Sequence, residues 1–240
     1  MDLKRRLWLG VAEVGMAFAG LVLGYALVGS LLGMFDAGPY HLMAGPLITA
    51  VAAAFYAWVG PQWAAAARDD DEPEPDLTMP PSSLSAGGAA GVVLLGVVVA
   101  LGGSIVLGLL LELVGLGVKE QTSVLEIADE ARGGGVQTEA IVLAVSALLM
   151  APVVEEWLFR RLLFVRVRAL SGPKLAYGLS AVAFAAIHGN PAGIVIYLWL
   201  GVVFAAVLAR TGRLWAAIAV HMGNNAYVLA VLFFGAEPGV

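Results

Sequence analysis

The chain has 240 residues, of which 60% are hydrophobic and 13% are charged, and its mean hydropathy is +0.90. A water-soluble domain has a more polar composition, so the sequence predicts an integral membrane protein. Cysteine is absent, which excludes disulfides and thiolate metal sites. The formal charge of −5 comes largely from the run "RDDDEPEPD", and elsewhere acids and bases nearly balance, so nothing indicates a nucleic-acid partner.

Seven apolar segments are long enough to span a bilayer core, which needs about 20 helical residues. They lie near residues 7–33, 41–66, 89–117, 138–158, 175–190, 193–210 and 214–234. The predicted fold class is therefore all-α, a polytopic membrane helix bundle with about seven transmembrane helices. The opening "MDLKRR" leads into a long apolar run, which predicts a retained anchor rather than a cleaved leader.

An acidic, proline-rich linker over residues 68–88 divides the chain. Residues 1–67 precede it and are predicted to form an N-terminal membrane hairpin of two helices. Residues 89–240 follow it as a membrane bundle. Within this bundle the loop 118–137 contains "SVLEIADEA", which predicts a short amphipathic helix at the membrane surface.

The basic residues predict the orientation, because cytoplasmic loops are enriched in lysine and arginine. With the N-terminus in the cytoplasm, only Lys119 and Arg132 fall outside. Glu13, Glu112 and His41 lie near segment ends, which predicts that they sit at the membrane interface. The eleven basic residues assigned to the inner side are Lys4, Arg5, Arg6, Arg68, Arg160, Arg161, Arg166, Arg168, Lys174, Arg210 and Arg213. Seven spans then place the C-terminus outside.

Charged side chains interrupt the apolar stretch "MAPVVEEWLFRR", residues 150–161. Such a charge at mid-helix costs about 2.5–3.5 kcal/mol on insertion scales, so it needs a partner, a water-filled cavity or a function. Glu156 and Arg160 are four residues apart, which predicts an ion pair on one helix face. Glu155 is rotated by about 100° from Glu156 and faces another neighbour. Pro152 removes a helix hydrogen bond, which predicts a kink one turn before Glu155.

Two later stretches place histidines on helix faces. "FAAIH" aligns Phe184 with His188, and "HMGNN" aligns His221 with Asn225. The only strong break between Glu155 and His188 is "SGP", so we expect a helical hairpin with arms of about 22 and 21 Å that brings these two side chains level. A carboxylate, two imidazoles and a carboxamide in a wet cavity suit the activation of water and the stabilisation of an oxyanion.

Each group also has a simpler structural or transport explanation. Glu156 and Arg160 can be an ion pair that lets a helix cross or end at the interface. Glu155 can be the proton-relay carboxylate of a transporter. His221 and Asn225 can form a hydrogen-bonded pair between helices. The case for chemistry rests on the three groups occurring together.

The three groups, in this order, resemble the CPBP family of intramembrane proteases, which includes the eukaryotic CAAX prenyl endopeptidases and the bacterial Abi-type immunity proteins. The motifs of that family are Glu-Glu-x-x-x-Arg, Phe-x-x-x-His and His-x-x-x-Asn. They match "EEWLFR" at 155–160, "FAAIH" at 184–188 and "HMGNN" at 221–225. The resemblance covers about residues 138–234, less than half of the chain.

The resemblance implies an all-helical membrane enzyme that cleaves a peptide bond. In such an enzyme Glu155 and His188 would activate the attacking water. His221 and Asn225 would stabilise the tetrahedral oxyanion. The remaining side chains of the motifs would order the site, and they are Glu156, Arg160 and Phe184.

The cofactor of such a site is left open by the resemblance. The family is described both as metalloproteases and as glutamate-dependent enzymes, so either no cofactor or one divalent metal such as zinc is expected. If a metal is used, its ligands would be Glu155, His188 and His221. The His-Glu-x-x-His pattern of soluble zinc proteases is absent.

The predicted function is an intramembrane endopeptidase of the CPBP/CAAX type that hydrolyses a peptide bond of a membrane-associated substrate. One alternative is a proton- or ion-coupled transporter, although no inverted repeat of broken helices is evident. Another is a non-proteolytic immunity or scaffold protein. The expected partners are a peptide or membrane-protein substrate and the lipid bilayer, and the expected location is the cell membrane.

Overall fold

The helical bundle is seen in a computed structural model that describes residues 2–34, 37–67, 74–117, 122–134 and 137–235. Helices make up nearly all of these residues, which confirms the all-α fold class. Among the described residues, six helices are long and apolar enough to cross a membrane: Leu3–Met34, Gly38–Ala66, Ala86–Leu113, Thr138–Ser171, Ile194–Thr211 and Leu214–Phe234. The chain is therefore a polytopic helical membrane bundle.

The prediction of seven full spans is wrong by one. The segment expected near 175–190 is a helix, α8 (Pro173–Ala186), but its 14 residues reach only about 21 Å, less than a hydrocarbon core of roughly 30 Å. It ends early because Gly189 adopts a left-handed conformation, with φ of 60°, just before Pro191. The preceding helix is correspondingly longer than predicted and continues to Ser171.

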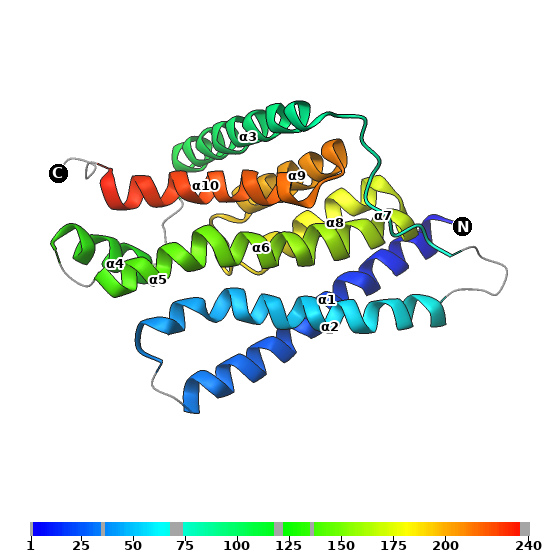
Figure 1. Ribbon diagram of the computed structural model, residues 1–240, viewed down its shortest axis with the longest axis horizontal. Coiled ribbons are helices and arrows are strands. Elements are labelled where there is room, and N and C mark those ends of the chain that lie inside the picture. Colours follow the sequence, from blue (N-terminus) through cyan, green and yellow to red (C-terminus); the bar gives the residue numbers. More distant parts are fainter. Residues whose placement is uncertain (1, 35–36, 68–73, 118–121, 135–136, 236–240) are drawn as a thin grey trace.

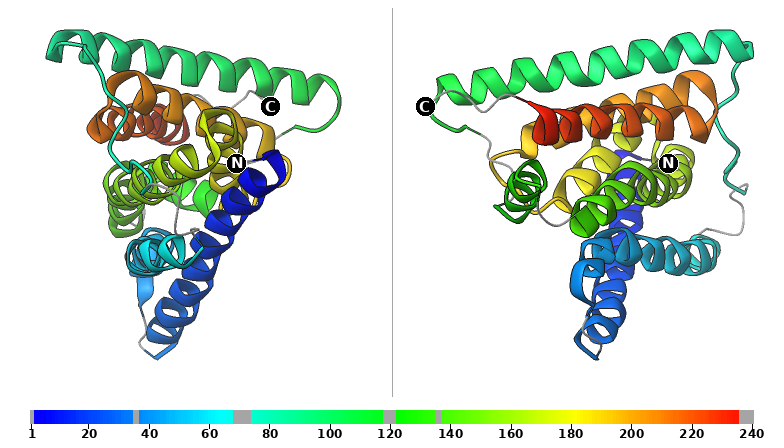
Figure 2. Two further views of the ribbon diagram at one scale, coloured as in Figure 1. Left: turned by 90° about the vertical axis from the view of Figure 1, so that its right-hand side faces the viewer. Right: turned by 60° about the vertical axis from the view of Figure 1, so that its left-hand side comes forward.

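A central helix organises the bundle. It runs through α5 (Gln137–Val145), a π-helical segment (Ser146–Met150), α6 (Ala151–Glu156), a second π-helical segment (Trp157–Phe164) and α7 (Val165–Ser171). The hairpin of α1 (Leu3–Met34) and α2 (Ala44–Ala66) packs on one side of it (Figure 1). A short 3₁₀-helix (Gly38–Met43) precedes α2. On the other side lie α9 (Ile194–Thr211) and α10 (Leu214–Phe234), with α3 (Ala86–Leu113) across their outer face (Figure 2).

The two predicted local features around this helix are present. The break at "SGP" is a turn at Gly172, whose φ of 92° joins α7 to α8 as a helical hairpin. The amphipathic helix predicted in the loop 118–137 is α4 (Thr122–Arg132). Its Ala128 is buried, which is consistent with a helix that rests on the bundle.

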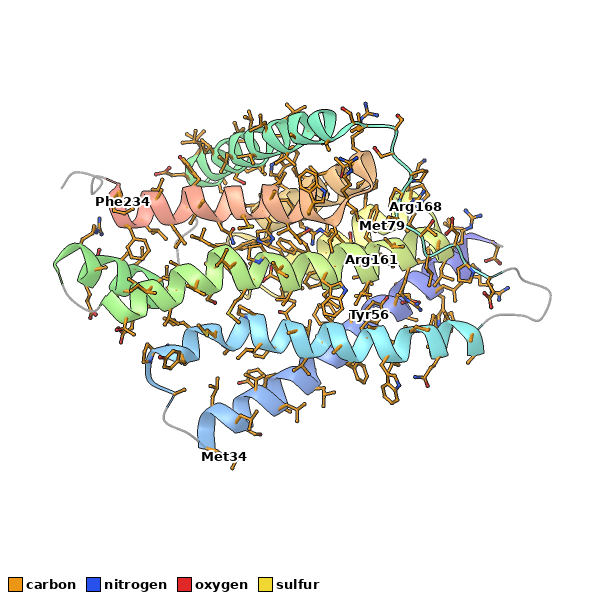
Figure 3. All side chains as sticks on the ribbon, viewed as in Figure 1. Met34, Tyr56, Met79, Arg161, Arg168 and Phe234 are labelled. Carbon is orange, nitrogen blue, oxygen red and sulfur yellow. The ribbon has the colours of Figure 1, made fainter. Side chains whose placement is uncertain are left out.

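The N-terminal hairpin is joined to the central helix by buried charges. Arg166 on α7 bonds both carboxylate oxygens of Glu13 on α1, at 2.8 and 2.9 Å, and Tyr56 on α2 donates to the same carboxylate. Glu13 and Tyr56 are fully buried, and Figure 3 shows Tyr56 where α2 faces the central helix. The prediction that Glu13 lies at the interface is wrong, because a partner 153 residues away neutralises it inside the bundle.

These contacts also correct the count of basic residues. Arg160 and Arg166 are buried and paired, so they belong to the interior rather than to a cytoplasmic loop. Arg68 and Lys119 lie outside the described residues. The start of α1 and the end of α10 lie at opposite ends of the bundle (Figure 1), while the side of the membrane that each end faces stays a prediction.

Part of the predicted linker runs along the bundle at the end where α1 begins. Leu77 and Met79 pack against the core, and the Leu77 carbonyl accepts a bond from Arg161. Figure 3 shows Met79 and Arg161 toward this end. The Pro80 carbonyl lies directly over Gly212, the left-handed residue that ends α9, so no other side chain fits at position 212.

The Glu13–Arg166 pair yields a stability prediction. Replacing Arg166 with leucine leaves a buried carboxylate without its cation, so we expect a loss of about 3–5 kcal/mol of unfolding free energy. The midpoint of unfolding in detergent measures the change. The matched control is Arg168→Leu at a partly exposed position of the same helix, which is expected to change stability by about 0.5 kcal/mol or less.

Candidate active site

The central helix is irregular where the first motif begins. Pro152 stands between the two π-helical segments, and the N–H of Ala151 bonds to the carbonyl of Ser146, five residues earlier. The irregularity predicted at Pro152 thus takes the form of π turns, which recur at functional sites in helices. The Nδ2 of Asn225 donates to the carbonyl of Ala147 at 2.9 Å, so α10 is fastened to this stretch.

Glu156 is the centre of a buried charge cluster. Its Oε2 lies 3.1 Å from Nε of Arg160, which confirms the predicted ion pair, and both side chains are fully buried. Its Oε1 lies 3.0 Å from Nδ1 of His221 on α10. This second partner was not predicted, and it means that Glu156 also holds one of the two motif histidines.

Aromatic rings enclose the cation of this cluster. The Arg160 guanidinium lies 4.4 Å from the ring centroid of Phe184 and 5.3 Å from that of Phe204. The negative faces of aromatic rings attract such a cation, most strongly where water is excluded. Phe184 is therefore in direct contact with the cation of the cluster.

Aromatic rings also stack on both motif histidines. His188 stacks on Tyr197 with ring centroids 4.0 Å apart and contacts Phe184 at 4.7 Å. His221 stacks on Phe204 at 4.7 Å. The Nδ1 of His188 lies 2.8 Å from the carbonyl of Phe184. Because a carbonyl only accepts, this nitrogen carries the proton, and Nε2 is left as the basic atom.

A cavity of about 340 Å³, here called the central cavity, brings the predicted catalytic residues together. Its polar lining consists of Glu155, His188, His221, Asn224, Asn225, Ser104, Ser146 and Tyr197. Glu155 is 9% exposed, and within the described part of the chain its Oε2 has no hydrogen-bond partner. The carboxylate of a glutamate that lines a cavity inside an apolar bundle is placed to hold a water molecule.

Several lining residues were not singled out from the sequence. Asn224 is the sequence neighbour of the motif residue Asn225, and it lines the cavity and donates through Nδ2 to Oδ1 of Asn225 at 3.2 Å. Tyr197 is one aromatic residue of an apolar helix, and its stacking on His188 has no local sequence signal. Ser146 and Ser104 look like ordinary membrane-helix serines.

The expected metal ligands were tested against the geometry. Among the residues that the structure describes, no three histidine, aspartate or glutamate side chains lie close enough to hold a metal ion, and this includes the trio Glu155, His188 and His221. The Nδ1 of His221 is also engaged by Glu156. The arrangement of these described residues does not fit a metal centre.

Sequence comparison finds a family match for the segment that contains the three motifs. Residues 137–227 match the family described as type II CAAX prenyl endopeptidase Rce1-like. The resemblance to the CPBP/CAAX protease family is confirmed for this segment. The protein named "Putative membrane peptidase YdiL" from Bacillus subtilis (strain 168) is 29% identical over 94 residues, 39% of this chain and 38% of that relative. The chain thus aligns with well under half of the length of that relative. No solved structure matches the chain significantly.

The hydrogen bonds of the histidines give a spectroscopic prediction. We expect neutral His188 to be the Nδ1–H tautomer, because its Nδ1 lies 2.8 Å from the Phe184 carbonyl, which can only accept. Nitrogen NMR of protein labelled at histidine reports the tautomer directly. Its resonance is assigned by its loss in His188→Gln, and the exposed His41, which lies 2.6 Å from the Gly38 carbonyl through Nδ1, serves as an internal reference. A dominant Nε2–H form at His188 would contradict the geometry.

Proposed function

We propose that the chain is an intramembrane endopeptidase in which a water molecule attacks a peptide bond inside the central cavity. The observation that carries this proposal is that residues of all three motifs, Glu155, His188, His221 and Asn225, line one polar cavity. The family resemblance of residues 137–227 supports the same reaction.

The attacking water is held between Glu155 and Nε2 of His188. Both are proton acceptors, and both side chains border the same cavity. Glu155 takes the proton as the water oxygen bonds to the peptide carbonyl carbon, and a positioned base of this kind contributes about 10²–10⁴-fold to a rate. Glu155 then gives the proton to the departing amine, which balances the hydrolysis.

The oxyanion formed in this step is stabilised from α10. Asn225 has a second Nδ2 hydrogen beyond the one that bonds Ala147, and Asn224 and His221 border the same space. Donors that are fixed in advance are worth most where water is scarce, because they need no reorganisation. Glu156 and Arg160 keep His221 in place through the 3.0 Å contact to its Nδ1.

Activity is tested with purified protein in liposomes and a set of single-span reporter proteins. Glu155→Gln is expected to lower the cleavage rate by about 10²-fold or more, because the base is lost while the volume is kept. His188→Gln is expected to act in the same direction. The matched control is Glu112→Gln at an exposed position of α3, which is expected to leave the rate unchanged.

Two results would contradict the proposal. One is full cleavage by Glu155→Gln with an unchanged unfolding midpoint. The other is ion flux that depends on Glu155 in liposomes where no reporter is cleaved, which would favour a transporter. A chelator titration of active protein decides the cofactor independently, since loss of activity that zinc restores would show a metalloprotease.

A further inference from the structure

A second pocket reaches the Glu155–His188 pair from the side of the N-terminal hairpin. It has a volume of about 530 Å³ and is here called the hairpin pocket. Its lining comprises Phe18, Leu21, Val22 and Tyr25 of α1, Gly45, Ile48 and Thr49 of α2, and Ile187 with Glu155 and His188. Glu155 and His188 line both pockets, so they stand at the boundary between the two.

Both helices of the hairpin present a regular face to this pocket. The lining positions of α1 are spaced as i, i+3, i+4 and i+7, and those of α2 as i, i+3 and i+4, which is one stripe along each helix. Val22 and Tyr25 are 71% and 72% exposed at its rim. In a membrane-spanning helix such residues face lipid, so the pocket opens toward the bilayer.

The walls of the pocket are held in place. Gly24 lets α1 approach so closely that a Cβ there would collide with the carbonyl of Ile48. The buried Glu13–Arg166 pair fastens α1 to the central helix. The pocket therefore belongs to the folded protein and does not depend on a loosely attached hairpin.

The two pockets differ in what they can bind. Apart from Glu155 and His188, the polar groups of the hairpin pocket are Tyr25 and Thr49, and the Thr49 hydroxyl already bonds the Gly45 carbonyl at 3.0 Å. The central cavity carries two asparagines and two serines, and one of these, Ser104, has a buried hydroxyl without a partner among the described residues. Within the described chain, neither lining includes a lysine or an arginine.

An apolar lining in one pocket and a polar lining in the other are what binding and cleavage of an apolar membrane segment require. A helix satisfies its own backbone in lipid and offers only side chains, whereas a segment unwound for cleavage must find polar partners. The hairpin pocket can bind the apolar side chains of the helix, and the central cavity can bind the polar backbone of the unwound segment. The lack of a cationic side chain in either lining leaves no charged group to bind the free carboxylate of a substrate C-terminus.

We infer that the hairpin pocket is a specificity site for large apolar side chains of a membrane-spanning substrate segment, next to the bond that is cut. This inference rests on the proposed peptidase activity and names its substrate class. The enzyme then cleaves inside apolar segments, with the cut set by an aromatic or branched side chain in the hairpin pocket. The N-terminal hairpin, which lies outside the family match, thereby selects the substrate.

The test uses the full chain in liposomes with single-span peptides whose apolar segment is made of leucine and alanine, with one phenylalanine moved stepwise along it. We expect the cut, located by mass spectrometry, to move with the phenylalanine. We also expect replacing that phenylalanine with alanine to lower kcat/KM by about tenfold or more, as the loss of an apolar side chain from a fitted pocket does. Peptides with free and amidated C-termini are expected to be cut alike.

The matched variants are Gly45→Phe and Gly29→Phe. A Cβ at either glycine meets no atom within 4 Å, but only Gly45 lines the pocket. Gly45→Phe is expected to fill the pocket and to remove the preference for the phenylalanine peptide over the alanine peptide. Gly29→Phe is expected to keep the full preference.

Binding is measured separately from cleavage with a photoreactive benzophenone side chain at position 45 or 29. We expect the phenylalanine peptides to be cross-linked from position 45 and not from position 29, also in a Glu155→Gln background. This measurement separates the specificity site from the peptidase activity. Cross-linking without any cleavage would support the hairpin pocket as a binding site and would contradict the peptidase activity. Cleavage that depends on Glu155 but ignores Gly45→Phe keeps the peptidase and overturns the specificity site.

Two further outcomes would also contradict the assignment of the hairpin pocket as a specificity site. One is a cut at a fixed distance from the peptide end wherever the phenylalanine stands. The other is cleavage restricted to a control peptide that ends in an isoprenoid-modified cysteine motif with a free carboxylate. Either result would assign the hairpin pocket to something other than apolar side chains of a membrane segment.

Discussion

The structure depends on neutralising charges that have been taken out of water. An isolated buried ion costs several kcal/mol even after the protein relaxes, so Glu13, Glu156 and their partners must be placed accurately for the helices to pack at all. The Glu13–Arg166 pair joins the hairpin to the central helix, and Glu156 joins the central helix to α10 through His221. Each cluster thus fixes how one side of the bundle meets the central helix.

The two clusters leave one carboxylate unpaired between them. Glu155 precedes Glu156 by one residue, which rotates it away from Arg160 by about 100° in a regular helix. Glu155 therefore lines the two cavities, and its Oε2 has no hydrogen-bond partner among the described residues. Adjacent glutamates with the same chemistry acquire different tasks from helical geometry alone, one as a structural anchor and the other as the candidate base.

Features that depend on nearby residues could be predicted from the sequence. The Glu156–Arg160 pair follows from a spacing of four, and the turn at Gly172 follows from a glycine before a proline. The contacts of Glu13 with Arg166 and of Glu156 with His221 span 153 and 65 residues, and no local pattern encodes them. The error at Glu13 arose because its position near a segment end was weighed without the partner that only the packed bundle supplies.

Irregular backbone sets the other limit on what a sequence can reveal. An extra residue in a π turn shifts the phase of a helix by about 100°, so a face drawn on an ideal helix does not continue from one side of such a turn to the other. The cavity is also wide enough to be bordered by both asparagines of "HMGNN", although neighbouring residues of a helix point in directions about 100° apart. Two residues of the first π-helical segment, Ser146 and Ala147, line the same cavity, and the Ala147 carbonyl accepts the hydrogen bond from Asn225. The irregular backbone of the central helix therefore borders the polar space together with the motif side chains.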